Sequence, residues 1–557
     1  MLFQGQMSRN KKKDISFLWN ALPAVFIFTI FYLFIYLVQG IPFVDDPYIA
    51  YRYAENWAAG HGPAYNIGEY VEGYSSFLSV AILAVASSLS FNLVTFAPIL
   101  NLFIGIGCIF LMSYLCTFIP FSRPRLTITV LSLLYALSYG VYHYGVSGWT
   151  DMLLGSLVLL FCIISLYKCK ASGNYLTALP SLFLLNIVRA EGPVYSLILL
   201  SVLTYFVVRE CKHIPRKLFV TIAAFLFLTG LLFLFRYSIY KEWIPATVMA
   251  KGFATYLLKK MLLNGDFWEI NRFLWVISEG FSYELPLLYT GVWIPYILLF
   301  RDKHKKNFLL CLIASSIAVN TLILIWAGGD FFKFHRQLIP MLPLMLIFVA
   351  WGVDLLICKS QKNEKKNKAL VYMALTALLV LWIGFFLKPV EIFKKRGVKP
   401  LSLHTQQIGT FLSEMPVPTV LMTDIAGIMP YYAGPRVYVR DLFGLTDIHN
   451  AKYGDAFCAP AEGGICGRTD YNYSFSKPFD IFVYNAYQIN ERFVTFCREN
   501  PAICQKYKFI MKEEWLKASI FVVADVTHPV AKALVDKYNI ATLPINEDLL
   551  NIVDKYK

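Results

Sequence analysis

The sequence predicts a polytopic α-helical membrane protein that ends in a soluble α/β domain, and three observations indicate this fold class. Of the 557 residues, 57% are hydrophobic and only 16% are charged, and the mean hydropathy is +0.54, which is too apolar for a protein soluble throughout. Many apolar runs reach the roughly 20 residues that a membrane-spanning helix needs. After about residue 390, short β-rich runs alternate with helix-like stretches, as in small α/β domains.

The first apolar run, residues 17–39, predicts an anchored helix rather than a signal peptide, because it is long and no small-residue cleavage site follows it. The leading residues MLFQGQ resemble the remnant of a viral 3C protease site. We therefore expect residues 1–6 to be foreign and the native sequence to begin at Met7.

Clusters of Lys and Arg predict the orientation in the membrane, since short basic segments remain in the cytoplasm. Eleven spans place every such cluster on the cytoplasmic side, and these spans are 17–39, 93–119, 126–146, 151–167, 174–190, 193–208, 217–240, 285–300, 307–327, 337–357 and 369–388. The apolar stretch 76–90 cannot cross in this topology, so we expect it to be an interfacial helix on the outer surface. The net charge of +15 is largely explained by these clusters, and nothing in it indicates nucleic-acid binding.

The sequence thus divides into a membrane domain, 7–390, with an outer loop at 40–75, and an extracytoplasmic α/β domain, 391–557. In that tail we expect four strands, within 419–424, 436–441, 480–485 and 519–525. On the oxidising side of a membrane, close cysteine pairs predict disulfides rather than free thiols. The simplest pairings are Cys458 with Cys466 and Cys497 with Cys504.

Two adjacent carboxylates, Asp45 and Asp46, follow the first span in a loop dense with Tyr, Gly and Asn. Charged side chains at this position suggest chemistry at the membrane surface. The structural alternative is a helix N-cap, because Asp before Pro47 is a good helix start. Both interpretations hold if one Asp caps the helix and the other acts chemically.

The segment that contains these carboxylates, DDPYIAYRYAENWAAGHGPAYNIGEYVEGYSSFL, resembles the first outer loop of GT-C membrane glycosyltransferases related to the terminal β-(1→2) arabinofuranosyltransferase of the mycobacterial cell wall. Further blocks follow in the family's order, namely SGWTD, LNIVRAEG, YKEWIPATVMAK, GGDFFKFHRQLIPMLP and DLFGLTDIHNAK. The resemblance covers residues 45 to about 452. Ala190, Ala246 and Gln337 depart from the family pattern, which leaves the sugar open.

The resemblance implies an inverting GT-C enzyme that transfers a sugar from a polyprenyl-phosphate donor to an extracytoplasmic glycan, glycolipid or protein. The sugar that the resemblance favours is arabinofuranose. Asp45 or Asp46 then acts as the general base that takes the acceptor proton. Another sugar, such as aminoarabinose or a hexose moved onto lipid A, a surface polysaccharide or a pilin, fits the same chemistry. A transporter or flippase for lipid-linked sugars is the rival of another class, although no internal repeat favours it.

The lipid phosphate that leaves needs positive charge at the membrane surface. We expect Lys251, His335 and Arg336 to supply it, because each is next to a predicted span on the outer side. The alternatives are that Lys251 only extends toward lipid headgroups and that Arg336 pairs with Asp330.

Other polar residues of the matching blocks are expected to bind substrate or to shape the site. We predict an ion pair between Arg52 and Glu72 and a second one between Arg189 and Glu191. The remaining members of this set are His61, Tyr74 and Asp330.

No metal is expected to be obligatory, since a lipid phosphate is a good leaving group that basic residues can neutralise. A divalent cation remains possible, because the carboxylates of the first loop are hard oxygen ligands. The predicted location is the inner membrane of a bacterium, among membrane lipids, with the N-terminus in the cytoplasm and the tail in the periplasm. We expect the tail to recognise or cover the acceptor.

Overall fold

The computed structural model describes residues 16–39, 44–251, 284–299, 307–327, 336–360, 400–459, 465–485 and 488–555, together with single positions between 369 and 383. The chain forms two compact units. We call Met1–Pro42, Thr95–Leu234 and Phe267–Gly397 the membrane unit, and Phe43–Val94, Phe235–Asp266 and Val398–Lys557 the loop–tail unit. The tail after residue 398 therefore shares one compact unit with the first predicted outer loop.

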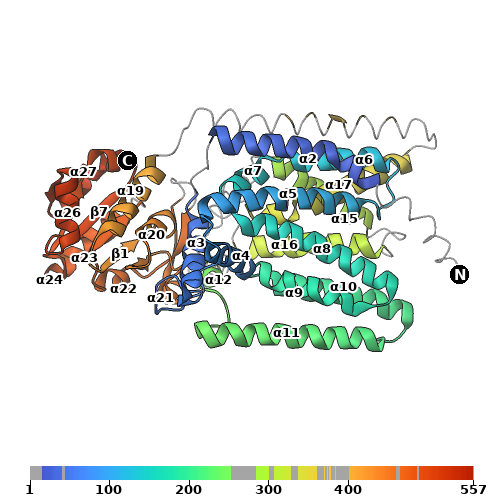
Figure 1. Ribbon diagram of the computed structural model, residues 1–557, viewed down its shortest axis with the longest axis horizontal. Helices are drawn as coiled ribbons and strands as arrows, with labels where there is room; N and C mark the ends of the chain where they lie inside the picture. The colour runs from blue at the N-terminus through green and yellow to red at the C-terminus, as the bar shows by residue number, and fades with distance from the viewer. Residues whose placement is uncertain are drawn as a thin grey trace, which may run out of the picture. The chain divides into compact units, whose positions relative to one another are not determined.

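The membrane unit is helical (Figure 1). Its described elements are α2 (Ser16–Phe34), η1 (Ile35–Gln39), α5 (Leu93–Cys116), α6 (Pro124–Ala136), α7 (Tyr139–Val146), α8 (Thr150–Ser172), η3 (Tyr175–Ala178), α9 (Leu179–Val188), α10 (Gly192–Cys211), α11 (Arg216–Tyr240), α15 (Glu284–Leu299), α16 (Phe308–Ala327), η5 (Arg336–Met341) and α17 (Leu342–Ser360). Helices suit this apolar chain because they satisfy their own backbone hydrogen bonds in a bilayer.

Seven of the described helices are long and apolar enough to cross a membrane, and there are eight if α6 and α7, bent by 47° at their junction, count as one span. Shorter apolar helices occupy the predicted spans 174–190 and 285–300. The predicted span 369–388 lies largely outside the described residues. Helices thus occur at every predicted span that the structure describes, and the chain is a multi-pass membrane protein.

The predicted interfacial stretch 76–90 forms α4 (Phe77–Ser88), a helix of 12 residues whose N-cap Ser76 side chain accepts the N–H of Ser79. At 1.5 Å per residue its length is about 18 Å, well short of the roughly 30 Å hydrocarbon layer. It therefore cannot cross a bilayer alone.

The orientation in the membrane stays a prediction that cysteine labelling tests. With a single introduced cysteine, a membrane-impermeant maleimide added from outside should label position 400 and should not label position 363, because the basic cluster 359–368 is placed in the cytoplasm. The reverse pattern would overturn the topology and the side on which we place the chemistry.

The loop–tail unit is built on a sheet. The first loop contributes α3 (Asp46–Asn56) and η2 (Trp57–His61), the stretch after it contributes α4, and the segment after α11 contributes α12 (Ala246–Lys251). The tail contributes α19 (Pro400–Glu414), β1 (Thr419–Thr423), α20 (Ile428–Ala433), β2 (Val437–Asp441), α21 (Ile448–Tyr453), β3 (Asp455–Ala459), β4 (Ile465–Thr469), α22 (Tyr471–Ser476), β5 (Ile481–Tyr484), α23 (Gln488–Glu499), α24 (Pro501–Cys504), β6 (Tyr507–Met511), α25 (Glu513–Lys517), β7 (Phe521–Asp525), α26 (Pro529–Tyr538), β8 (Ala541–Leu543) and α27 (Glu547–Asp554).

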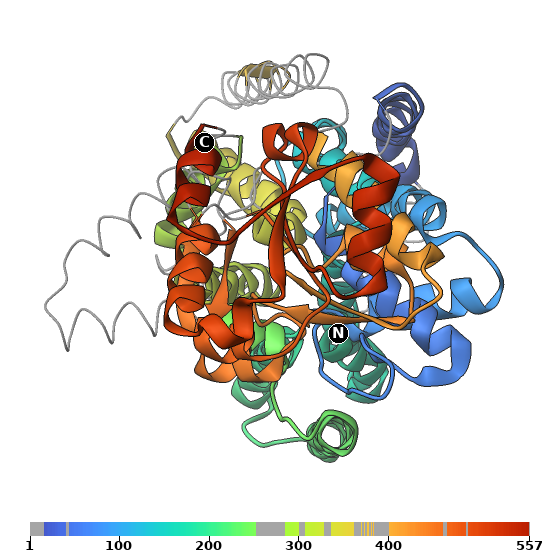
Figure 2. The same ribbon diagram turned by 90° about the vertical axis from the view of Figure 1, so that its left-hand side faces the viewer.

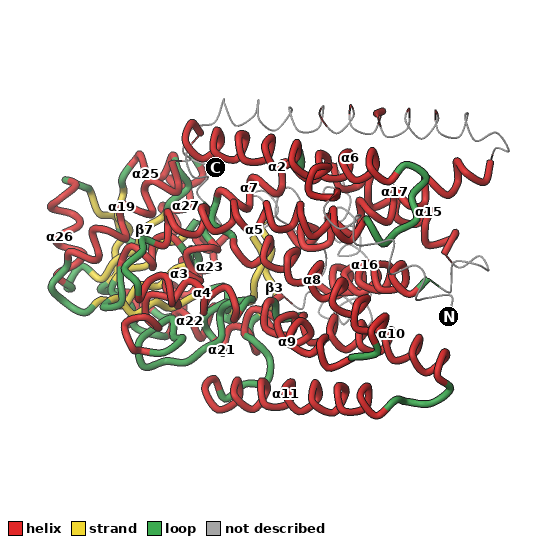
Figure 3. Tube along the Cα trace, turned by 45° about the vertical axis from the view of Figure 1, so that its right-hand side comes forward, coloured by secondary structure: helices red, strands yellow, loops and turns green. Residues whose placement is uncertain are grey.

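The described strands form a six-stranded sheet in the order β2-β1-β5-β7-β6-β8 and a separate β3-β4 hairpin. Strand β1 runs parallel to both of its neighbours, β2 and β5, and the remaining pairs are antiparallel. Helices cover both faces of the sheet (Figure 2), and the tube view shows the strands of the sheet side by side (Figure 3). All four predicted strands are present, as β1, β2, β5 and β7.

Alternate residues of each strand point to opposite faces, so the sheet has two hydrophobic cores. One core, formed around Leu421, Val483 and Val522, also receives Ile49 and Tyr53 from α3. The other core contains Phe482 and many aromatic side chains of α22 and α23. The first loop is therefore part of the tail's hydrophobic core.

Candidate active site

The loop–tail unit places Asp45 against the loop that follows β1. The N–H of Gly427 donates to Asp45 Oδ2 at 2.8 Å, and the N–H of Ile428 donates to Oδ1 at 2.7 Å. The Asp45 side chain makes no hydrogen bond to the first turn of α3, so its carboxylate does not cap this helix. Asp46 is the first residue of α3, where a negative charge is favourable at the helix N-terminus.

Burial is the largest influence on the Asp45 carboxyl group, and it raises the pKa to about 7. The hydrogen bonds from Ile428 and Gly427 lower this pKa, whereas the charges of Asp46 and Asp424 raise it. A carboxylate with a pKa near 7 can accept a proton efficiently at neutral pH. The carboxylate pair of the sequence thus contains one group that is suited to act as a base.

The neighbourhood of Asp45 is the carboxyl-end edge of the parallel strands. Asp424 follows β1 and accepts the N–H of Asn485, which follows β5, at 2.9 and 3.0 Å. Asp441 ends β2 and accepts the N–H groups of Phe443 and Thr446. Open α/β sheets bind ligands in the crevice outside such strand ends. In this protein that edge receives Asp45 from the same chain.

Arg52 attaches α3 to the C-terminal end of α20 and to the residues that follow it. Its guanidinium donates to the carbonyl of Tyr65 at 2.8 Å, to that of Gly434 at 3.0 Å, to that of Val437 at 2.7 Å and also to that of Pro430. The side chain is buried and its charge lies over the Tyr65 ring. Arg52 therefore holds the first loop on the tail.

The predicted ion pair between Arg52 and Glu72 is wrong. Glu72 bonds instead to Arg236, with 2.6 Å between Oε2 and Nε, and burial raises the pKa of Glu72. The reason is geometric, because Arg52 is surrounded by backbone carbonyls that already use its donors. Both residues stabilise the first loop, but with different partners.

Two further residues predicted for the first loop differ in burial. The Tyr74 hydroxyl is buried and shares a hydrogen bond of 2.7 Å with the Tyr240 hydroxyl. His61 is exposed at the end of η2, and its carbonyl accepts the Tyr70 hydroxyl. The contacts of Tyr74 are those of a core residue, whereas His61 stays accessible.

Lys251 ends α12, a helix whose Ala246 and Ala250 pack with Val71 and Ala451. The N–H of Ala246 donates to the carbonyl of Glu72 at 3.0 Å. Lys251 therefore belongs to the same unit as Asp45. His335 and Asp330 lie outside the described residues.

The membrane unit holds a second group of residues from the matching blocks. Arg189 forms the predicted ion pair with Glu191, and its Nη1 also lies 3.1 Å from Asp151 Oδ2. Arg336 is buried, and its guanidinium lies 4.8 Å from the centre of the Trp149 ring. Asp151 and Trp149 are thus site candidates that residue-by-residue reasoning missed, although both stand in the block SGWTD.

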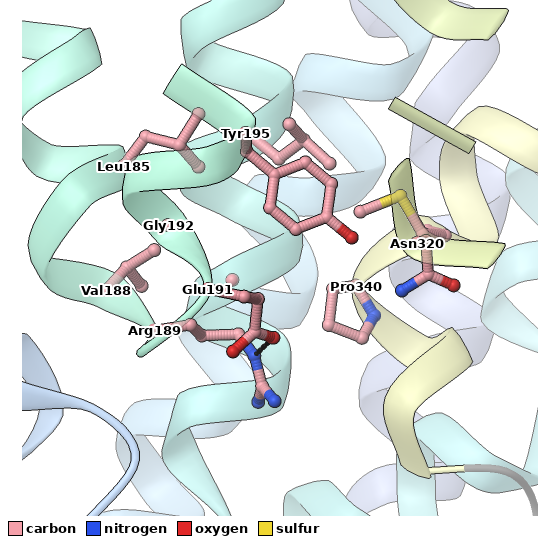
Figure 4. A pocket seen from close by; sticks show the side chains of 11 residues that line it. Leu185, Val188, Arg189, Glu191, Gly192, Tyr195, Asn320 and Pro340 are labelled. Atoms are coloured by element: carbon pink, nitrogen blue, oxygen red, sulfur yellow. Dashed lines mark hydrogen bonds and ion pairs between the residues drawn. The ribbon is translucent and has the colours of Figure 1, made fainter. Parts of the chain in front are cut away.

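A pocket with an empty volume of about 320 Å³, open space included, adjoins this group. Its lining residues are Gly155, Leu159, Leu185, Val188, Arg189, Glu191, Gly192, Tyr195, Asn320, Pro340 and Met341. Figure 4 shows the Arg189–Glu191 pair at one end and the Tyr195 hydroxyl pointing toward Asn320. The lining is mainly apolar, and its polar side chains are those of Arg189, Glu191, Tyr195 and Asn320.

Sequence reasoning missed Gly427, Asp424 and Asn66. The Asn66 side chain donates to the carbonyl of Val439 at 2.9 Å and accepts the N–H of Val439 at 3.0 Å. It thus makes the two hydrogen bonds that the backbone of a neighbouring strand would make. A Cβ on Gly73 would meet the carbonyl of Leu445 at 2.7 Å, so the blocks VEGY and GLTD lie in direct contact. Such contacts have no local signature in the sequence.

The tail contains a disulfide between Cys497 and Cys504, whose Cα atoms are 5.4 Å apart. Cys458 and Cys466 are direct partners across the β3-β4 hairpin, and their side chains lie outside what the structure describes. Among the described residues, no three His, Cys, Asp or Glu side chains gather as they would around a metal ion.

No family model matches the sequence, and no curated protein sequence matches it significantly. Among solved structures, the chain is similar to ArnT from Cupriavidus metallidurans bound to undecaprenyl phosphate, with a TM-score of 0.52 and 12% identity over 90% of this chain and 98% of that one. The apo form of ArnT from that organism gives a TM-score of 0.47 and 13% identity over 91% and 98% of the two chains. The first comparison confirms the predicted fold class: the chain has an ArnT-like GT-C fold of membrane helices with a C-terminal sheet domain.

Proposed function

We propose that the protein is a bacterial inner-membrane glycosyltransferase that moves a sugar from a polyprenyl-phosphate donor to an extracytoplasmic acceptor. The observation that carries the proposal is Asp45, a carboxylate just beyond a membrane span that accepts the N–H groups of Gly427 and Ile428 and whose pKa burial raises to about 7. Two findings support it, namely the blocks that resemble GT-C enzymes and the fold shared with an ArnT structure that holds undecaprenyl phosphate.

In the proposed reaction, Asp45 takes the proton of an acceptor hydroxyl while the hydroxyl oxygen attacks C1 of the donor sugar. The bond between C1 and the phosphate oxygen breaks, and its electron pair leaves with the lipid phosphate. The products are a glycoside and polyprenyl phosphate, and a single displacement inverts the configuration at C1. The negative charge of Asp46 stabilises the positive charge that develops on the sugar ring.

For the sugar we propose arabinofuranose first, on the resemblance of the first loop, with aminoarabinose or a hexose as the alternatives. For the acceptor we propose a glycan, glycolipid or protein outside the cytoplasm. Mass spectrometry of the lipid that co-purifies with the protein would name the sugar. A transfer assay with that lipid tests the function, because a transporter or flippase would form no glycosylated product.

We propose that Lys251, His335 and Arg336 meet the donor phosphate. Replacing each with alanine should raise the KM for the donor about 10-fold or more and leave the KM for the acceptor nearly unchanged, since a charged hydrogen bond contributes about 1.5–3 kcal/mol. The control is Lys217, an exposed residue at the start of α11. Lys217→Ala should change neither the donor KM nor the acceptor KM. A raised acceptor KM with normal donor affinity would reassign the residue to the acceptor.

We propose that transfer has no obligatory metal. Chelation with EDTA should therefore leave the rate within about a factor of two, because cationic side chains can neutralise the leaving phosphate. The assay is run with and without added Mg²⁺ or Mn²⁺. A rate abolished by EDTA and restored by one of these ions would show that the carboxylates of the first loop hold a cation.

A further inference from the structure

The loop after β1 fits Asp45 so closely that only glycine can occupy position 427. A Cβ on Gly427 would lie 1.8 Å from the backbone oxygen of Asp45 and 2.7 Å from its Cγ. Both distances are shorter than the 3.0 Å below which real Cβ atoms essentially never approach another heavy atom. A larger residue must therefore displace Asp45. The close approach is what brings the two amides of this loop onto the carboxylate.

Helix α20 is held at both ends by the first loop. Its first amides contact Asp45, and the carbonyls of Pro430 and Gly434 near its end contact Arg52. Asp45 and Arg52 flank the first two turns of α3. Two short elements, one from the first loop and one from the tail, thus hold each other in a fixed register.

Asp424 adds charge to the same place. It is buried at the end of β1, and both of its oxygens accept the N–H of Asn485. Among the described residues, the titratable groups whose charges act together with that of Asp45 are Asp46, Asp424, Tyr48 and Tyr65. The charges of the two aspartates raise the pKa of Asp45, that of Asp46 more than that of Asp424.

We propose that Asp424, Gly427 and Ile428 are positioning residues for the catalytic base, so that the tail supplies the strand-end edge on which Asp45 is oriented. This inference rests on the proposed function and goes beyond a tail that only recognises the acceptor. The backbone amides fix the direction of the carboxylate, and the Asp424 charge makes the carboxylate more basic.

The two kinds of positioning group act on the base in opposite directions, which makes the proposal testable by pH dependence. Transfer requires the ionised base, so the rate rises with pH through the pKa of Asp45. Asp424→Asn removes a negative charge that raises the pKa of Asp45, so it should move this acidic limb to lower pH. Gly427→Ala displaces the amide donors and should move the limb to higher pH, with kcat lowered about 100-fold by the misplaced base.

The control is Asp480→Asn. Asp480 accepts the N–H of Val420 at 2.7 Å near the opposite end of β1, so the substitution removes the same charge from a similar bond away from Asp45. It should leave the acidic limb in place. Gly230→Ala, where a Cβ would meet nothing within 4 Å, controls for the added methyl group.

A second measurement does not depend on catalysis. Infrared titration of the purified full-length protein follows the protonated-carboxyl band that Asp45→Asn removes, and Asp424→Asn should shift its midpoint to lower pH. If wild-type protein transfers no sugar but the band shifts, the proposed function fails and the positioning role stands. If neither the band nor the acidic limb moves in Asp424→Asn, or if folded Gly427→Ala keeps full activity, the positioning role is overturned.

Discussion

Replacing Asp45 with asparagine should lower the rate of sugar transfer at least about 100-fold, the range expected when a general base is removed. Asparagine keeps the shape of the side chain and one acceptor for the amides of Gly427 and Ile428, so the loop should stay in place. It cannot take the proton of the acceptor hydroxyl. Single-turnover transfer with the lipid-linked donor measures the loss, and binding of the donor should survive.

Asp46→Asn distinguishes the two members of the carboxylate pair. If Asp45 is the base, Asp46→Asn should lower the pKa of Asp45 and move the acidic limb of the rate to lower pH, in addition to weakening the stabilisation of the positive sugar ring. Glu55→Gln is the matched control, because Glu55 lies on α3 and accepts the Tyr431 hydroxyl at 2.7 Å. Full activity in both aspartate variants would contradict a catalytic role for the pair.

Replacing Arg52 with alanine should destabilise the loop–tail unit by about 3 kcal/mol or more. The substitution leaves four carbonyls without their charged donor, and each bond to a charged group contributes about 1.5–3 kcal/mol. The melting temperature of the detergent-solubilised protein measures the effect. Activity should fall with it, since α3 carries the carboxylate pair at its start.

Two variants make the Arg52 prediction specific. Arg52→Lys keeps the charge but cannot reach four carbonyls with one ammonium group, so its stability should lie between those of wild type and Arg52→Ala. Arg436→Ala removes an exposed arginine of the same unit that bonds only one described carbonyl, that of Ser413, and should shift the melting temperature little. Equal melting temperatures for Arg52→Ala and Arg436→Ala would show that Arg52 does not hold the loop.

Much of the fold could be predicted from the sequence because its signals are local. A long run of apolar residues indicates a membrane helix without further information. The four strand predictions match β1, β2, β5 and β7 because short runs rich in β-branched and aromatic residues also need no distant information. Strands such as β6 (Tyr507–Met511) were missed, since Lys508 interrupts a short apolar run. The β3-β4 hairpin was missed because Cys, Gly and Ala make poor strand signals.

The candidate site was predictable only in part. The Asp pair at 45 and 46 and the ion pair between Arg189 and Glu191 could be predicted, because the members of each pair are close together in the sequence. The partners of Arg52 are carbonyls more than 370 residues away, except for that of Tyr65, and backbone carbonyls leave no trace in residue identity. Glu72 was paired with the wrong arginine for the same reason, since proximity along the chain is weak evidence of contact.

The bond between Asp45 and the loop after β1 joins residues 382 positions apart, which has a consequence for biosynthesis. A ribosome that adds 5–20 residues per second needs roughly 20–75 s to produce the second partner after the first. During that interval the first loop has already emerged and its carboxylate lacks the amides that fix it. Under the proposed function, incomplete chains should therefore carry no premature transferase activity, because their carboxylate is not yet fixed.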